Sequence, residues 1–128
     1  LAVDLYSSRN AQGTLVCFQE HVVGNDPYQH IGQQDITTQV DYASLMRLGV
    51  GRGLTTVGYT LQRHFLDDLG FSSLLDELQT RDLSYARAEL TRMAMMTLVD
   101  PEEYGNFKVL AQAKGLGSDI KLLGFKER

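Results

Sequence analysis

The sequence predicts an α/β fold in which helices connect the strands of a sheet. Two observations between residues 35 and 70 indicate this class. Ile36, Thr38 and Val40 alternate with polar residues, which is the period of a half-buried strand. Residues 54–59 form a second β-rich run, and a helical pattern follows each run. Because alternating strands and helices are typical of α/β sheets, we expect the rest of the chain to be arranged around this stretch.

The first helix is expected to begin after Asp41, which can cap it, and to end at a group of glycines. Its apolar residues recur at helical spacing: Tyr42, Leu45, Met46 and Leu48. The glycines are Gly49, Gly51 and Gly53. A dinucleotide fingerprint lies between a strand and the helix after it, whereas these glycines follow a helix and precede a strand. We therefore interpret them as a helix end and a loop.

Three further helical segments follow the second strand. Thr60 is expected to cap a helix that carries Leu61, Phe65, Leu66 and Leu69 and ends at Gly70. Ser72 or Ser73 is expected to cap a short helix with Leu74, Leu75 and Leu78. Residues 82–100 have an amphipathic pattern, and Asp100-Pro101 signals a helix restart. We interpret Met93, Met95 and Met96 as core residues rather than as an adaptable binding surface.

The remaining segments are predicted to be strands and one long loop. Residues 1–6, 13–18 and 107–113 are short apolar runs of the strand type, and residues 120–125 form a weak edge strand. Residues 19–34 are expected to be irregular, because they contain strong turn signals. Since the chain opens directly into an apolar strand, we expect it to be a fragment of a larger sheet.

Composition limits the functions that this chain can have. Its 128 residues form one domain or less, and a net charge of −4 argues against non-specific nucleic-acid binding. Cys17 is the single cysteine, so no internal disulfide forms, and its apolar neighbours predict a buried core residue. No apolar run is long enough to span a membrane. His21, His30 and His64 lack the spacing of a metal site, so none is expected.

Several short motifs follow one another through most of the chain. They are Gly13-Thr14-Leu15 with His21 and Asp26-Pro27, Asp35-Ile36-Thr37 with Val40-Asp41-Tyr42, Gly58-Tyr59-Thr60 with Gln62 and His64-Phe65-Leu66, Gly70-Phe71, and Gly105-x-Phe107-Lys108-Val109-Leu110. In this order and spacing the sequence resembles the MidA family of S-adenosylmethionine-dependent methyltransferases, which includes the mitochondrial complex I assembly methyltransferase. The resemblance covers the C-terminal part of the family alone.

The resemblance implies the C-terminal half of a class I, Rossmann-like methyltransferase sheet with inserted helices. Residues 1–128 are then a C-terminal fragment of one methyltransferase domain. Residues 1–6 correspond to the fifth strand of that fold, residues 54–59 to the sixth and residues 107–113 to the seventh. The seventh strand of the family runs antiparallel between the other two, so we expect it to pair with both.

The resemblance also implies S-adenosylmethionine as the cofactor of the full-length parent. The family holds this cofactor with a Gly-rich loop after its first strand and an acidic residue at the end of its second, and neither motif occurs in this chain. We therefore expect the fragment itself to be inactive and to bind no cofactor. The sequence departs from the family at Asp4-Leu5-Tyr6-Ser7, which lacks the usual glycine, and at Gln39, where members often have histidine.

Gln62 and His64 are the substrate-side candidates, because they lie near the start of a helix that follows a strand, where substrate contacts of α/β enzymes collect. The alternative is that Gln62 caps the helix and His64 is a surface residue. By analogy with the mitochondrial member, we expect the parent to methylate a protein arginine linked to respiratory-complex assembly. It would act in the bacterial cytoplasm or the mitochondrial matrix.

A second hypothesis makes the chain a non-catalytic interaction or assembly module. Its partner surface would be the 19–34 loop and the methionine-bearing helix. In either case the strand at residues 1–6 would have an unpaired edge, so we expect a homo-oligomer through that edge or a loop that covers it.

Overall fold

The computed structural model describes residues 13–20, 22–116 and 120–127, and these have a mixed α/β structure. The chain divides into two compact units, one up to Arg47 and one from Leu48. The strand predicted at residues 1–6 lies outside the described residues, and so does its predicted pairing.

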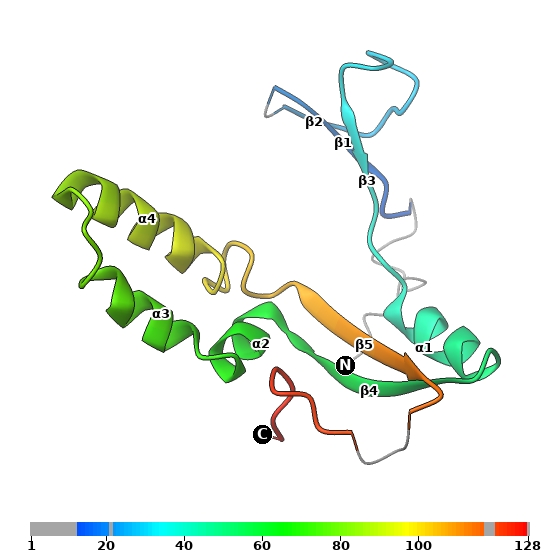
Figure 1. Cartoon of the computed structure of the whole chain (residues 1–128). Coiled ribbons are helices and arrows are strands. Elements are labelled where there is room, and N and C mark those ends of the chain that lie inside the picture. The colour runs from blue at the N-terminus through cyan, green and yellow to red at the C-terminus, as the bar shows by residue number, and fades with distance from the viewer. Residues whose placement is uncertain (1–12, 21, 117–119, 128) are drawn as a thin grey trace. The chain divides into compact units, whose positions relative to one another are not determined.

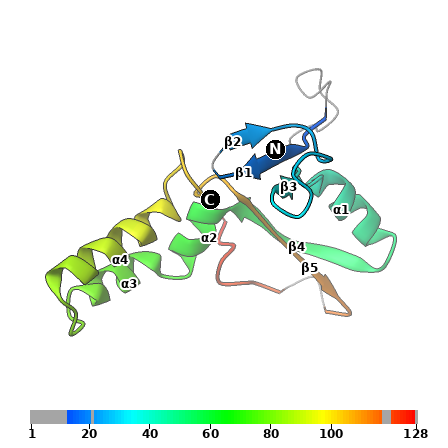
Figure 2. The same ribbon diagram turned by 90° about the horizontal axis from the view of Figure 1, so that it is seen from above.

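The first unit contains a small antiparallel sheet in the order β2-β1-β3 (Figure 2). β1 (Val16–Gln19) pairs with β2 (Val22–Gly24) on one side and with β3 (Asp35–Thr37) on the other. The strands predicted at 13–18 and 36–40 are confirmed in part. The irregular structure predicted for 19–34 is wrong at β2, because its two valines pair with β1.

Burial in this sheet differs between its strands. Cys17 is 2% exposed, so its predicted place in the core is confirmed. Ile36 and Val40 are 56% and 52% exposed, so the half-buried face predicted for their strand is wrong. β3 pairs along three residues and presents them to solvent, which the alternation of residue types does not reveal.

The predicted capping of the first helix is confirmed. α1 (Tyr42–Val50) follows Asp41, whose Oδ1 accepts a hydrogen bond of 2.9 Å from the backbone N–H of Ser44. Hydrogen bonds from the Ser44 hydroxyl and then from its N–H hold the pKa of Asp41 below its usual value. The helix ends at Val50, so Gly49 lies inside it, and the following turn reaches Gly53, which has a φ of 76°.

The second unit is organised around a two-stranded antiparallel ribbon (Figure 1). β4 (Leu54–Leu61) pairs with β5 (Lys108–Lys114) from Leu54 opposite Lys114 to Leu61 opposite Lys108. This confirms the predicted antiparallel pairing of the strands at 54–59 and 107–113. The register shifts between Thr56 and Gly58, which marks a β-bulge.

In the sequence, three helices lie between the two paired strands of the ribbon. They are α2 (Gln62–Asp68), α3 (Phe71–Leu78) and α4 (Tyr85–Thr97). Figure 1 shows α3 and α4 as an antiparallel pair. No helix in the described part of the chain is both long enough and apolar enough to cross a membrane.

The predicted starts of these helices are wrong. Thr60 belongs to β4, because the strand stays paired through Leu61, and Leu61 precedes α2 without a side-chain cap. α3 begins directly after Gly70, which has a φ of 91°, so neither Ser72 nor Ser73 caps it. At Thr60, strand pairing overrides the local capping signal.

Further corrections concern the segments around α4 and the chain's last residues. α4 is shorter than the helix predicted for 82–100, and residues 101–106 form turns instead of a restarted helix. Residues 120–125 form no strand. Met93 and Met96 are 60% and 43% exposed, so their predicted core role is wrong for this chain.

Candidate functional site

The candidate site lies where β4 passes into α2, beside the connection between α4 and β5. No loop separates the strand from the helix, since Leu61 ends β4 and Gln62 begins α2. The N–H of Gln62 donates to the carbonyl of Phe107 at 2.7 Å. The N–H of Arg63 donates to the carbonyl of Gly105 at 3.1 Å. The two carbonyls therefore satisfy the first two helix donors, which would otherwise need a cap or an anion.

The Gln62 side chain braces the same connection. Its Nε2 donates to the carbonyl of Leu98 at 2.8 Å. Leu98 is the residue that follows α4, so this bond joins the end of one helix to the start of another. Gln62 makes no side-chain cap, which rules out the capping interpretation of this residue. Its predicted contact with substrate stays a prediction.

Arg63 links His64 to the connection. Its guanidinium donates through Nη1 to Oδ1 of Asn106 and through Nε to Nε2 of His64, the latter at 3.2 Å. Nδ2 of Asn106 donates in turn to the carbonyl of Pro101 at 2.8 Å. His64 is half-buried and accepts this hydrogen bond. Its predicted substrate role stays a prediction.

Gly105 makes the close approach of the connection possible. It is buried, its N–H donates to the carbonyl of Asp100 at 2.8 Å, and its own carbonyl accepts from Arg63. A Cβ at this position would collide with the carbonyl of Val99 and would lie 2.7 Å from the carbonyl oxygen of Asp100. Only glycine fits this turn without a backbone shift.

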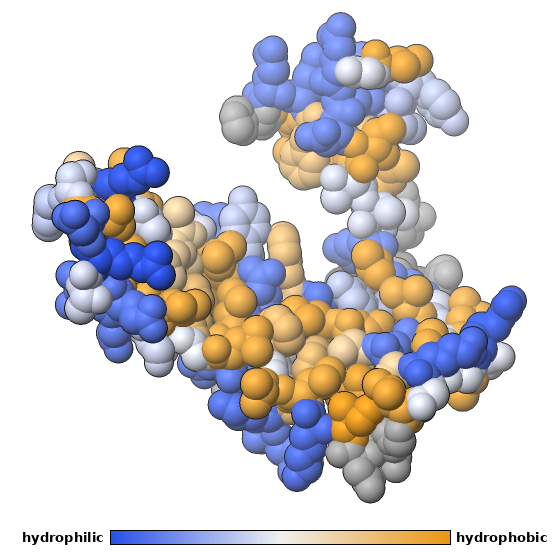
Figure 3. Space-filling model, viewed as in Figure 1, coloured by the Kyte–Doolittle hydropathy of each residue, from blue (hydrophilic) through white to orange (hydrophobic). Residues whose placement is uncertain are grey.

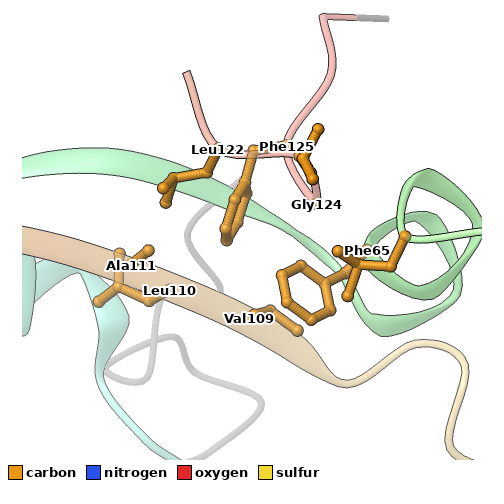
Figure 4. A pocket seen from close by; sticks show the side chains of 9 residues that line it. Phe65, Val109, Leu110, Ala111, Leu122, Gly124 and Phe125 are labelled. Carbon is orange, nitrogen blue, oxygen red and sulfur yellow. The ribbon is translucent and has the colours of Figure 1, made fainter. Parts of the chain in front are cut away.

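A separate apolar cavity of about 390 Å³ lies on the same unit (Figure 4). It is lined by Phe65, Leu69, Val109, Leu110, Ala111, Leu122, Leu123, Gly124 and Phe125. Figure 3 shows hydrophobic side chains gathered over this part of the unit. The lining lacks the charged and polar side chains that a ribose or an amino-acid group would need, so the cavity favours packing over cofactor binding.

The described residues contain no group of three or more His, Cys, Asp and Glu side chains that could hold a metal ion. Gly49 lies in the last turn of α1, whereas Gly51 and Gly53 follow this helix and precede β4. None of them stands between a strand and the helix after it, as the glycines of a dinucleotide loop do.

Arg63, Gly105 and Asn106 were not identified from the sequence as parts of a site. Gly105 and its neighbours belong to the Gly105-x-Phe107 motif, so the sequence marked the segment without its contacts. The bonds that join Arg63 to Asn106 and Gln62 to Leu98 span 43 and 36 residues, which local patterns do not reveal.

Comparison with known proteins gives one family match and similar solved structures. Residues 1–60 match a family described as "Putative S-adenosyl-L-methionine-dependent methyltransferase". No curated protein gives a significant match to the chain.

Two crystal structures from Burkholderia thailandensis are similar to nearly the whole chain. One is an uncharacterized protein, with 35% sequence identity and a TM-score of 0.79. The match covers 95% of this chain and 32% of the chain of that protein. The other is a member of the same superfamily described as a "likely methyl transferase" and bound to S-adenosyl-homocysteine. It has 33% identity and a TM-score of 0.77 over 94% of this chain and 30% of its own.

The chain thus spans about a third of the length of the solved structures that it matches. The resemblance to S-adenosylmethionine-dependent methyltransferases is confirmed over residues 1–60 by the family match, and the structural similarity extends to nearly the whole chain. S-adenosyl-homocysteine is what remains of S-adenosylmethionine after methyl transfer, so its presence in a relative implies that cofactor for this group of proteins.

Proposed function

We propose that this chain is the C-terminal part of an S-adenosylmethionine-dependent methyltransferase. The observation that supports this most is the similarity of 94% of the chain to under a third of a relative that holds S-adenosyl-homocysteine. In this proposal the parent methylates a protein side chain, and the analogy with the mitochondrial family member favours an arginine of a respiratory-complex subunit. The proposed compartment follows the same analogy, either bacterial cytoplasm or mitochondrial matrix.

The cofactor supplies an electrophilic methyl group, so the protein's part is to position the nucleophile and to control its proton. In our proposal the first turn of α2 contributes to the substrate side of the parent. Three hydrogen bonds of 2.7–3.1 Å, two from Gln62 and one from the backbone N–H of Arg63, join this turn to residues 98–107 and fix its backbone. Arg63 and His64 are the polar side chains that this frame positions.

The test uses calorimetric titration with S-adenosyl-homocysteine and a methyl-transfer assay with labelled cofactor and a protein substrate mixture. The complete parent protein should bind the ligand saturably and label a protein. The 128-residue chain alone should bind none, because the polar groups that the family uses for ribose and amino acid are not in it. A parent that binds no ligand would refute the proposed activity. Saturable binding by the short chain would instead refute its placement in the fold.

The second candidate is a non-catalytic interaction module. Leu90, Met93 and Met96 of α4 favour it, because they leave apolar surface exposed at helical spacing. This hypothesis predicts that Leu90→Lys with Met93→Lys abolishes partner or self-association of the chain in light scattering. Unchanged association in a folded double variant would exclude α4 as the surface, and residues 19–34 and the edge of the strand predicted at residues 1–6 would be the remaining proposed routes.

A further inference from the structure

We infer that Arg63 is a positioning residue that selects, for the neutral ring of His64, the tautomer protonated on Nδ1, so that any contact this ring makes through Nδ1 is made as a hydrogen-bond donor. The consequence for methyl transfer rests on the proposed function. The assignment of the proton does not.

The ends of the hydrogen-bonded chain determine its direction. The Pro101 carbonyl can only accept, so the amide of Asn106 must turn its Nδ2 toward it, at 2.8 Å. This leaves Oδ1 of Asn106 facing Arg63, which is the contact observed. A guanidinium has donors and no acceptor, so Arg63 donates at both of its side-chain contacts.

This direction determines the state of His64. Nε2 lies 3.2 Å from Nε of Arg63 and must accept, so it carries a lone pair and no proton. A neutral imidazole with a bare Nε2 has its proton on Nδ1. The imidazolium form cannot make this bond, because both of its nitrogens are donors.

The backbone holds Arg63 in place for this task. Its N–H is tied to the Gly105 carbonyl at 3.1 Å, and the preceding residue is tied to Phe107 and Leu98. Arg63 is thus held twice: its guanidinium binds the side chain of Asn106, and its backbone N–H binds the carbonyl of Gly105, the residue before Asn106. Fixing the tautomer of a histidine through a neighbour's hydrogen bond is a recognised way to set what the other ring nitrogen can do.

The inference changes the expected chemistry of the site. While Arg63 occupies Nε2, that nitrogen cannot take a proton from a substrate nucleophile. His64 can orient an acceptor atom through Nδ1–H, which is a role that the amide of asparagine can reproduce, because its Nδ2 lies at the same distance from the backbone as Nδ1 of histidine. A general base, by contrast, cannot be replaced by an amide.

The direct test is a long-range ¹H–¹⁵N correlation spectrum of the chain at a pH where its histidines are neutral. The His64 signal, identified by its loss in His64→Gln, should show a protonated Nδ1 and a bare Nε2. In Arg63→Met the protonated-Nε2 form should become the major one, whereas His30 stays unchanged. Arg87→Met is the matched control, because Arg87 lies on exposed α4 and should leave His64 as it is. A protonated Nε2 in the wild-type chain, or an unchanged tautomer in folded Arg63→Met, would overturn the inference.

If Arg63→Met does not fold, Asn106→Ala provides the second variant. It removes the outer anchor of the guanidinium and should lower the share of the Nδ1-protonated form. An unchanged share would count against the chain of bonds described above.

In the complete parent enzyme, His64→Asn should keep kcat within about threefold of wild type, and His64→Ala should lower it at least tenfold. Equal losses in both variants would show His64 acting as a base and would contradict the inference. A parent without methyl-transfer activity would refute the proposed function alone, because the spectra of the chain would still decide the tautomer.

Discussion

Replacing Gly105 with alanine should destabilise the second unit more than any other single added methyl group in its turns. The new Cβ would meet two backbone carbonyls, of Val99 and Asp100, the second at 2.7 Å. A flexible side chain could move away from such a contact, but a backbone carbonyl moves only with the turn that holds it. The turn also contains the hydrogen bonds from Gly105 N to Asp100 O and from Arg63 N to Gly105 O.

The size of the effect follows from these contacts. Overpacking a well-packed site costs about 1–3 kcal/mol. Each hydrogen bond that the shifted turn loses adds about 1 kcal/mol. We therefore expect Gly105→Ala to lower the free energy of unfolding by about 2–5 kcal/mol, which is a large part of the stability of a small domain.

Urea unfolding followed by far-ultraviolet circular dichroism measures the change, with the slope checked against wild type so that a midpoint shift reports stability. Gly51→Ala is the matched control, because its Cβ would lie 3.5 Å from the Leu48 carbonyl, an ordinary contact in the turn between α1 and β4. It should change stability by less than about 0.5 kcal/mol. If Gly105→Ala unfolded at the same urea concentration as Gly51→Ala, the close approach at Gly105 would not exist in solution.

Three further predictions concern other contacts of the described residues. Gly58→Ala should cost about 1–3 kcal/mol, because its Cβ collides with the ring of Phe125, and most of the cost should vanish in a Phe125→Ala background in urea melts. Gln62→Ala should cost about 1 kcal/mol by the same measurement through loss of its bond to Leu98, and a variant as stable as wild type would show that this bond contributes nothing. The lowered pKa of Asp41 stabilises the fold above the carboxyl's unfolded value, 3.8, and this contribution is lost as the pH falls through the folded value. Asp41→Asn keeps the cap without the charge. The free energy of unfolding of wild type minus that of the variant, measured in urea melts, should therefore decrease as the pH falls into the acid range. A difference that does not change with pH would contradict the lowered pKa of Asp41.

The sequence predicted the local parts of the fold better than the non-local ones. Asp41 caps α1 because its partner Ser44 is three residues away, a spacing that the sequence displays directly. The pairing of β4 with β5 was predictable through the family resemblance and the apolar runs. Thr60 was misassigned because strand pairing continues through Leu61, and a capping residue in sequence does not report what the opposite strand does.

Parts of the candidate site could not be predicted from the sequence, because their contacts are non-local. Gln62 and His64 were identified from their motif, but Gln62 contacts Leu98, 36 residues away, and the Arg63 side chain that contacts His64 also binds Asn106, 43 residues away from Arg63. The start of α2 was expected to need a side-chain cap. Its first two N–H groups instead donate to the carbonyls of Phe107 and Gly105, which lie in the segment just before β5. A sequence pattern contains no sign of a cap contributed by backbone atoms, because every residue type has a carbonyl.

This arrangement makes the start of α2 depend on the ribbon that it extends. Leu61 pairs with Lys108. The next residues, Gln62 and Phe107, are joined by the hydrogen bond that the first N–H of α2 donates. Strand pairing and helix capping are therefore one continuous ladder of hydrogen bonds. Gln62→Ala alters the frame together with any substrate contact, so a loss of turnover in that variant alone cannot separate the two roles. The contrast between His64→Asn and His64→Ala tests the substrate side by itself, because neither change removes a bond from that ladder.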